Sequence, residues 1–265
     1  MNFALSTLLL FFLLIPGILF RRFYYSEEFS KEYFKETFFG VFIATFLPSL
    51  FFHFLWYFLV KIFNQEVDLF ILANILSQNP EKSSFSNIQQ NSINILLYNA
   101  SMFLVAGVSG YSLKKVVRKQ KWDRLNKFFR FQNSWHYVLK GEFFDFPKAD
   151  ITLDEDTVED IEFVFIDAIV EINNESYLYD GILVDYELSN DGGLRNISLT
   201  GAERRNLKND SKIVDGIKAD NSGKYYPIKG HILLLKYSEI KNLNFTYYTL
   251  TFDKEKGEFT PREVE

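Results

Sequence analysis

The sequence predicts an α + β membrane protein, with an N-terminal three-helix transmembrane region followed by a cytosolic small β-barrel. Residues 38–60 contain no Asp, Glu, Lys or Arg, and two more uncharged apolar stretches occur before residue 114. The two halves also differ in charge. Residues 1–121 contain 11 basic and 7 acidic residues, a net charge of +4, whereas residues 122–265 contain 18 and 27, a net of −9. The second half therefore reads as a water-exposed domain.

The three apolar stretches are long enough to cross a bilayer. Residues 38–60 would form a helix of roughly 34 Å, and a bilayer core is about 30 Å thick. Residues 3–20 are predicted to be a first span rather than a signal peptide, because no small-residue cleavage pattern follows them. Residues 92–113 are the third span. Residues 67–76 are too short to span and predict a helix on the outer surface.

Basic residues predict the orientation of these spans. Residues 21–37 contain four Lys or Arg, residues 61–91 contain two, and residues 114–121 contain five. Cytoplasmic loops are enriched in Lys and Arg. We therefore expect a multi-pass protein of a bacterial inner membrane, with its N-terminus outside and its C-terminal domain in the cytoplasm.

Several polar or small residues within the spans are predicted to contact other helices. Asn94 and Asn99 can hydrogen-bond across helices, and Ala106 and Gly110 allow close backbone approach. His53 is an ionisable residue at membrane depth, which makes it a functional candidate. Packing within the chain, contact in a homo-oligomer and a conducting pore all remain open, with packing favoured.

Residues 114–149 predict a basic helical connector, and its helix is expected to stop at Gly141. Its basic side could bind anionic lipid headgroups. Residues 150–187 contain 13 acidic residues and no Lys or Arg. Their spacing matches neither a calcium-binding loop nor a two-carboxylate hydrolase site, so a solvated acidic face is expected and no metal site is predicted.

The C-terminal domain, residues 150–265, has the pattern of a small barrel. Strands are predicted at 161–172, 177–188, 194–199, 231–237 and 245–252, with a turn at 173–175 and a polar excursion over 201–226. Gly181 lies inside the second strand, where a small barrel needs a sharp bend. The segments YDGILVDYEL, GGLRNISL and HILLLKYSEIKNLNFTYY follow the strand order of an SH3-like or Sm-like barrel.

With both halves considered, the chain resembles a family of uncharacterised bacterial membrane proteins that join N-terminal spans to such a barrel. This resemblance implies a fold and a membrane location. It implies no activity, because that family has none agreed.

No catalytic motif, cofactor motif or cysteine is found in the sequence. The ligand-binding candidates are Trp135 and His136 in the connector and Arg204 and Arg205 after the third strand. The two arginines could recognise a carboxylate or phosphate, although an ion pair with the acidic face is the favoured alternative.

Two functions follow from this pattern. The first is a non-enzymatic adaptor or sensor, anchored in the lipid bilayer, whose barrel binds a protein, peptide or small ligand. The alternative is a membrane effector, in which the barrel gates a pore or leak formed by the spans, as in antiphage defence. Nucleic acid is not favoured as a partner, because a domain with a net charge of −9 repels phosphate.

Overall fold

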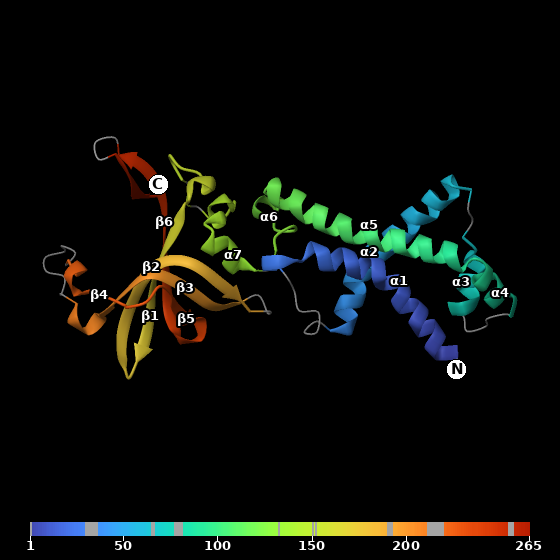
Figure 1. Cartoon of the computed structure of the whole chain (residues 1–265), viewed down its shortest axis with the longest axis horizontal. Coiled ribbons are helices and arrows are strands. Elements are labelled where there is room, and N and C mark those ends of the chain that lie inside the picture. Colours follow the sequence, from blue (N-terminus) through green and yellow to red (C-terminus); the bar gives the residue numbers. More distant parts are fainter. Residues whose placement is uncertain are drawn as a thin grey trace. The chain divides into compact units, whose positions relative to one another are not determined.

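The computed structural model describes residues 2–29, 37–64, 67–76, 82–131, 133–149, 151, 153–189, 193–210, 220–253 and 257–265 (Figure 1). The chain divides into two compact units, Met1–Lys121 and Trp122–Glu265. We call them the helical unit and the sheet unit. The boundary lies where the net charge of the sequence changes sign.

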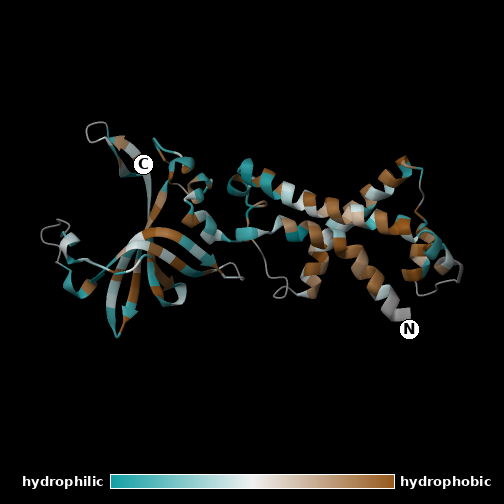
Figure 2. Cartoon of the chain, viewed as in Figure 1, coloured by the Kyte–Doolittle hydropathy of each residue, from teal (hydrophilic) through white to brown (hydrophobic). Residues whose placement is uncertain are grey.

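The helical unit contains three helices that are long and apolar enough to cross a membrane, as predicted (Figure 2). They belong to α1 (Asn2–Tyr24), α2 (Phe38–Ile62) and α5 (Ser92–Lys119). The short helix expected at residues 67–76 is α3 (Leu69–Leu76). A one-turn 3₁₀ helix, η1 (Glu27–Phe29), follows α1, and α4 (Lys82–Gln90), which was not predicted, precedes α5.

The helices α1 and α2 meet where α1 contains a proline. Pro16 has no amide hydrogen, so it removes one hydrogen bond from α1. The adjacent Gly17 amide donates to the Ser49 hydroxyl oxygen at 2.9 Å, and the Ser49 hydroxyl donates to the Leu14 carbonyl at 3.0 Å. A Cβ atom at Gly17 would overlap the Thr45 carbonyl oxygen. The backbones of α1 and α2 are therefore in direct contact at this crossing.

The helix α5 packs against both other long helices. Gly110 lies against the backbone of Phe20 in α1, where no Cβ atom would fit. Ala106 and Met102 form a buried cluster with Phe52 and Trp56 of α2. Trp56 also donates its indole N–H to the Ser101 hydroxyl at 3.0 Å. These contacts give the helical unit its own core.

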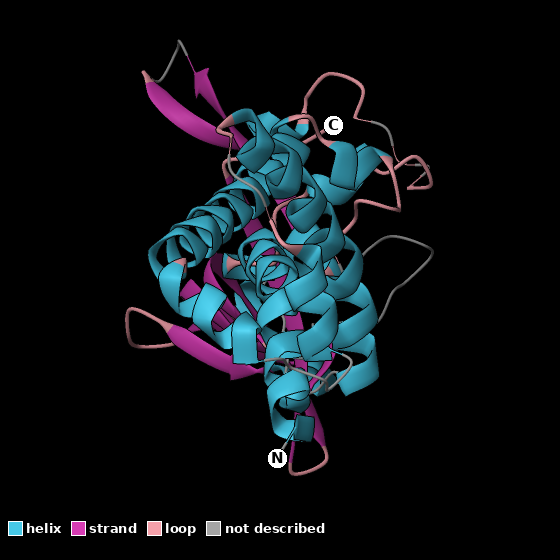
Figure 3. Ribbon diagram, turned by 90° about the vertical axis from the view of Figure 1, so that its right-hand side faces the viewer, coloured by secondary structure: helices cyan, strands magenta, loops and turns pink. Residues whose placement is uncertain are grey.

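A curled, entirely antiparallel sheet forms the second unit (Figures 1 and 3). Its strand order is β4-β3-β2-β1-β6-β7, and β5 pairs separately with β3. The strands are β1 (Phe163–Ile172), β2 (Glu175–Leu188), β3 (Leu194–Asn206), β4 (Tyr226–Pro227), β5 (Leu233–Lys236), β6 (Ile240–Asp253) and β7 (Glu258–Glu263). The sheet forms a half-barrel, and one of its faces covers the core.

The core follows from the alternation of residues along β1. Val164, Ile166, Ala168 and Val170 are buried, while the residues between them face the other side. Leu139 reaches the same core from the connector. Hydrophobic burial on this face fixes the register of the central strands.

Several strands differ from the sequence-based expectation. The expected third strand ends at 199, but β3 continues to Asn206 because Gly201, with φ of +59°, permits a bulge and residues 203–206 then pair with β2. The expected fifth strand, 245–252, corresponds to β6, which begins at Ile240. The strands β4 and β7 were not predicted. The turn at 173–175 is present, with positive φ at Asn173 and Asn174.

The connector is divided between the two units. The helix α5 ends at Lys119, and Lys121 has a φ of +56°. Short helices follow, α6 (Trp122–Leu125) and α7 (Ser134–Leu139), in place of one continuous helix. The predicted stop at Gly141 is confirmed by its left-handed conformation, φ +70°.

Replacing Gly17 with alanine should destabilise the helical unit. The new methyl group would meet the Thr45 carbonyl and the Ser49 hydroxyl, and overpacking of this kind costs about 3 kcal/mol when backbone must move. Thermal unfolding of the purified chain in detergent measures the effect. Ala100→Val, on the exposed side of α5, is the control. An unchanged midpoint for Gly17→Ala would contradict the direct contact of α1 and α2.

Candidate binding surface on the sheet unit

Three of the candidate residues in the spans contribute to packing within the chain. His53 donates from Nε2 to the Leu13 carbonyl of α1 at 3.0 Å, which requires the tautomer protonated at Nε2. Ala106 is fully buried, and Gly110 lies against α1. Asn94 is exposed and Asn99 bonds its own helix, at the Ile95 carbonyl, with a distance of 2.7 Å.

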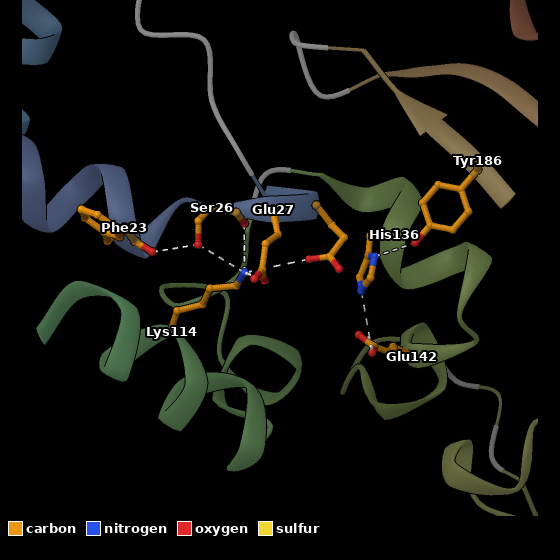
Figure 4. Close-up of polar contacts among 8 residues, drawn as sticks. Phe23, Ser26, Glu27, Lys114, His136, Glu142 and Tyr186 are labelled. Carbon is orange, nitrogen blue, oxygen red and sulfur yellow. Dashed lines mark hydrogen bonds and ion pairs between the residues drawn. The ribbon is translucent and has the colours of Figure 1, made fainter. Parts of the chain in front are cut away.

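Trp135 and His136 lie on α7 and pack the connector against the sheet. Trp135 makes edge-on contact with Tyr237 at 5.1 Å between ring centroids. His136 is only 6% exposed, and its Nδ1 lies 2.7 Å from the Tyr186 hydroxyl (Figure 4). Its Nε2 lies 4.0 Å from a carboxylate oxygen of Glu142. Both side chains therefore join α7 to neighbouring elements of the sheet unit.

Buried ion pairs hold the connector segment in one conformation. Arg124 contacts Glu142 at 2.9 Å and Asp145 at 2.6 Å, and the Tyr137 hydroxyl donates to Asp123 at 2.9 Å. Breaking a buried pair leaves an uncompensated charge and costs about 3–5 kcal/mol. This segment therefore has a defined fold of its own and is more than a flexible tether.

Arg204 and Arg205 occupy opposite faces of β3, because successive side chains of a strand alternate. Arg204 pairs with Tyr179 of β2 and Tyr226 of β4, on the face that covers the core. Arg205 is opposite Leu178, on the outer face. The two guanidinium groups therefore belong to different surroundings and cannot bind one anion together.

On the core side, at the end of the sheet, Arg204 lies among three tyrosines. Its guanidinium carbon is 4.7 Å from the ring centre of Tyr226 and 5.6 Å from that of Tyr177, and Nη1 donates to the Tyr179 hydroxyl at 3.4 Å. We call these four residues the rim cluster. Glu175 borders the cluster and accepts hydrogen bonds from the Tyr177 hydroxyl and from Asn206.

On the outer face, Arg205 forms an ion pair with Asp210, and its guanidinium lies 5.0 Å from the ring centre of Tyr225. Tyr225 also lies near Asp180 and partly offsets the rise in the pKa of that carboxyl group. These contacts join β3 to the segments that flank the excursion at 211–219, whose own residues lie outside the described part of the chain.

Three carboxylates form a row across the outer face. Asp167 is opposite Asp180, and Asp180 is opposite Glu203. Asn244 extends the row to β6 by donating to Asp167 at 3.0 Å. Asp180 is only 8% exposed, and burial, followed by the charges of Asp167 and Glu203, raises its pKa to about 6.

A shallow depression adjoins the rim cluster. It lies between β3 and the segment after β4, and its lining residues are Leu199, Ala202, Ile228, Lys229, Gly230, His231, Ile232 and Leu233. Ala202 is two residues from Arg204 on β3, and Ile228 is two residues from Tyr226. Among the described residues, no group of three or more His, Cys, Asp or Glu side chains is placed to hold a metal ion.

Comparison with known proteins adds no identification. No family model, curated protein or solved structure matches the chain. The chemistry of the rim cluster must therefore be argued from its own geometry. A cation set against aromatic rings and hydroxyl groups is suited to hold an anionic group.

Sequence reasoning selected Arg204 but missed its partners. The tyrosines at 177 and 179 are spaced two apart, which places them on one strand face, and this signal was available. Tyr226 lies on a two-residue strand in a polar segment, where no periodicity indicates it. Asp180 was counted only as part of the acidic stretch, since its burial depends on strand pairing.

Replacing Asp180 with asparagine should stabilise the chain at neutral pH. A pKa raised from 3.8 to about 6 means that the folded state binds this proton more tightly than the unfolded state. The group's contribution is therefore largest below pH 4 and is lost as the pH rises through 6. The full shift corresponds to about 3 kcal/mol, and solvent screening of the carboxyl group reduces the expected change below that value. Asp180→Asn should exceed the parent in unfolding free energy at pH 7.5, with little advantage at pH 4.

Urea unfolding followed by Trp135 fluorescence, in a background with Trp56 and Trp122 replaced by Phe, measures this difference. Asp185→Asn, at an exposed position of the same strand, is the control. A stability difference for Asp180→Asn that stays constant between pH 4 and 7.5 would disprove the raised pKa.

Proposed function

We propose that the chain is a membrane-anchored, non-enzymatic adaptor or sensor whose sheet unit binds a ligand at the rim cluster. The observation that carries this proposal is Arg204 held among Tyr177, Tyr179 and Tyr226 on a unit separate from the membrane-capable helices. A protein, a peptide or a small ligand would bind at this surface and would not be chemically altered there.

The order of the strands supports an SH3-like barrel as the identity of the sheet unit. The path β1-β2-β3-β5 is a meander, if the two-residue strand β4 is set aside, and β6 returns to pair with β1. The 3₁₀ turn η7 (Tyr237–Glu239) separates β5 from β6, which is the place where such barrels have a short helical turn.

The distribution of basic residues supports a bacterial inner-membrane location with the sheet unit in the cytoplasm. Arg21 and Arg22 lie in the last turn of α1, and Arg118 and Lys119 lie in the last turn of α5. The C-terminal ends of both helices would therefore lie on the cytoplasmic side of the membrane. The lipid bilayer is then the partner of the exposed apolar side chains of α2, and a second copy of the chain is an alternative occupant of that face.

Reporter fusions test the orientation. A green fluorescent protein fused after Glu265 should be fluorescent, because it folds in the cytoplasm, whereas alkaline phosphatase at the same point should be inactive. Fusions between Lys61 and Leu69 are the internal control: there the phosphatase should be active and the green fluorescent protein should not be fluorescent. Phosphatase activity at the C-terminal fusion would overturn the orientation.

Membrane potential distinguishes the adaptor from the effector. Cells that express the full chain should retain their potential, because Asn94 is simply exposed and Asn99 bonds its own helix. A potential-sensitive dye measures this in cells with the full chain, with Asn94→Leu/Asn99→Leu, and with an empty vector. Depolarisation that the double variant abolishes would favour a pore or leak over an adaptor.

A further inference from the structure

We infer that the rim cluster binds a small ligand through one oxyanion, a carboxylate or a phosphate, with Arg204 as its anchor. This inference rests on the proposed function and gives the chemical class of the ligand. The first observation is a difference between two adjacent arginines. Arg205 has Asp210 as its ion-pair partner, whereas no carboxylate of the described residues lies within ion-pair distance of Arg204.

The surroundings of Arg204 prepare its guanidinium for an anion. The rings of Tyr226 and Tyr177 contact it, at 4.7 and 5.6 Å from the guanidinium carbon to the ring centres. A guanidinium that rests on aromatic faces directs its N–H groups in its own plane, where a carboxylate or phosphate is bound by two hydrogen bonds at once. The hydroxyl groups of the tyrosines can add further hydrogen bonds.

The charges around the rim cluster limit the size of the anion. The residues of the sheet unit sum to −9, from 18 basic and 27 acidic residues, so a polyanion is repelled as it approaches. Locally the charges are mixed, because Lys229 lines the depression beside Arg204 while Glu175 borders the cluster. A single oxyanion can use the local attraction of Arg204 and Lys229, whereas a nucleic acid would also meet the surrounding carboxylates.

Arg205 provides a matched control for Arg204. The two residues are neighbours, have the same charge and both contact tyrosine rings, but they occupy opposite faces of β3. Loss of either charge changes the net charge of the chain equally. A loss of binding confined to Arg204 variants is therefore an effect of position, and long-range electrostatics cannot explain it.

Anion binding is measured with the full chain in detergent, from the rise in unfolding temperature on adding sodium phosphate or sodium acetate in place of sodium chloride at constant ionic strength. We expect saturable stabilisation with a millimolar dissociation constant. Arg204→Gln should weaken it about 10-fold or more, since hydrogen bonds to charged groups contribute roughly 1.5–3 kcal/mol. The dissociation constant of Arg204→Lys should lie between those of the parent and Arg204→Gln, because lysine keeps the charge but lacks the planar guanidinium group. Arg205→Gln should bind as the parent does.

Three results would overturn the inference: no stabilisation beyond chloride, equal stabilisation of Arg204→Gln, or tighter binding of a 20-nucleotide single strand than of phosphate. Circular dichroism of each variant shows whether it is folded, and Arg204→Lys provides the test if Arg204→Gln is not. Partners that the Arg204→Gln chain captures as well as the parent does would leave a membrane-anchored adaptor standing, with its binding site away from Arg204, while this inference fails.

The source of the oxyanion is distinguished with lipid nanodiscs. If the oxyanion belongs to a soluble molecule, phosphate should stabilise the chain equally in nanodiscs of neutral lipid and in nanodiscs with phosphatidic acid. If phosphatidic acid prevents the effect of phosphate, the group at Arg204 is a lipid headgroup. Either result therefore shows whether the oxyanion bound at Arg204 comes from a soluble molecule or from a lipid.

Discussion

The arrangement of the helical unit depends on hydrogen bonds from side chains of α2 to backbone groups of α1 around Pro16. In a hydrocarbon layer no water can bond a free backbone group, and an unsatisfied one costs several kcal/mol. Pro16 leaves the Phe12 carbonyl without its helical donor. Side chains of α2 bond neighbouring backbone groups: Ser49 accepts from the Gly17 amide and donates to the Leu14 carbonyl, and His53 donates to the Leu13 carbonyl. The absence of a side chain at Gly17 lets α2 approach closely enough for these bonds. Ser49 and His53 of α2 therefore have a structural explanation, and on α1 the backbone of Phe20 separately contacts Gly110 of α5.

In the sheet unit the corresponding constraint is the alternation of faces along each strand. Burial of one face of β1 sets the register, and the register then determines which polar residues meet. On the core side it brings tyrosines from β2 and β4 to Arg204, and on the outer side it aligns three carboxylates. The sheet thus has Arg204, without a carboxylate partner among the described residues, on one face and the buried acid Asp180 on the other. Neither arrangement is a property of any one segment, since each requires three strands.

The sequence predicted what depends on local composition. Uncharged length identified the membrane-capable helices, paired asparagines identified the turn before β2, and Gly141 marked the end of α7. It failed where tertiary pairing overrides composition. Residues 203–206 are polar and read as a loop, yet pairing with β2 extends β3 over them. The two arginines were treated as one binding pair, although alternation along an extended strand already places neighbours apart. Tyr226 depends on a two-residue strand that no periodic pattern reveals.

One buried lysine has a consequence for how the helical unit assembles. Lys114, near the end of α5, is 4% exposed, and its ammonium group contacts the Ser26 carbonyl at 2.9 Å and the carboxylates of Glu27 and Glu28 (Figure 4). Lys114 holds the pKa of Glu27 below its usual range. All these partners lie in the turn after α1, some 90 residues earlier in the sequence, so the end of α5 depends on groups that the first helix positions. Until both are present, that ammonium group must remain in water. Burial of Lys114 is thereby linked to placement of the turn after α1, which couples the two ends of the helical unit across the length of its sequence.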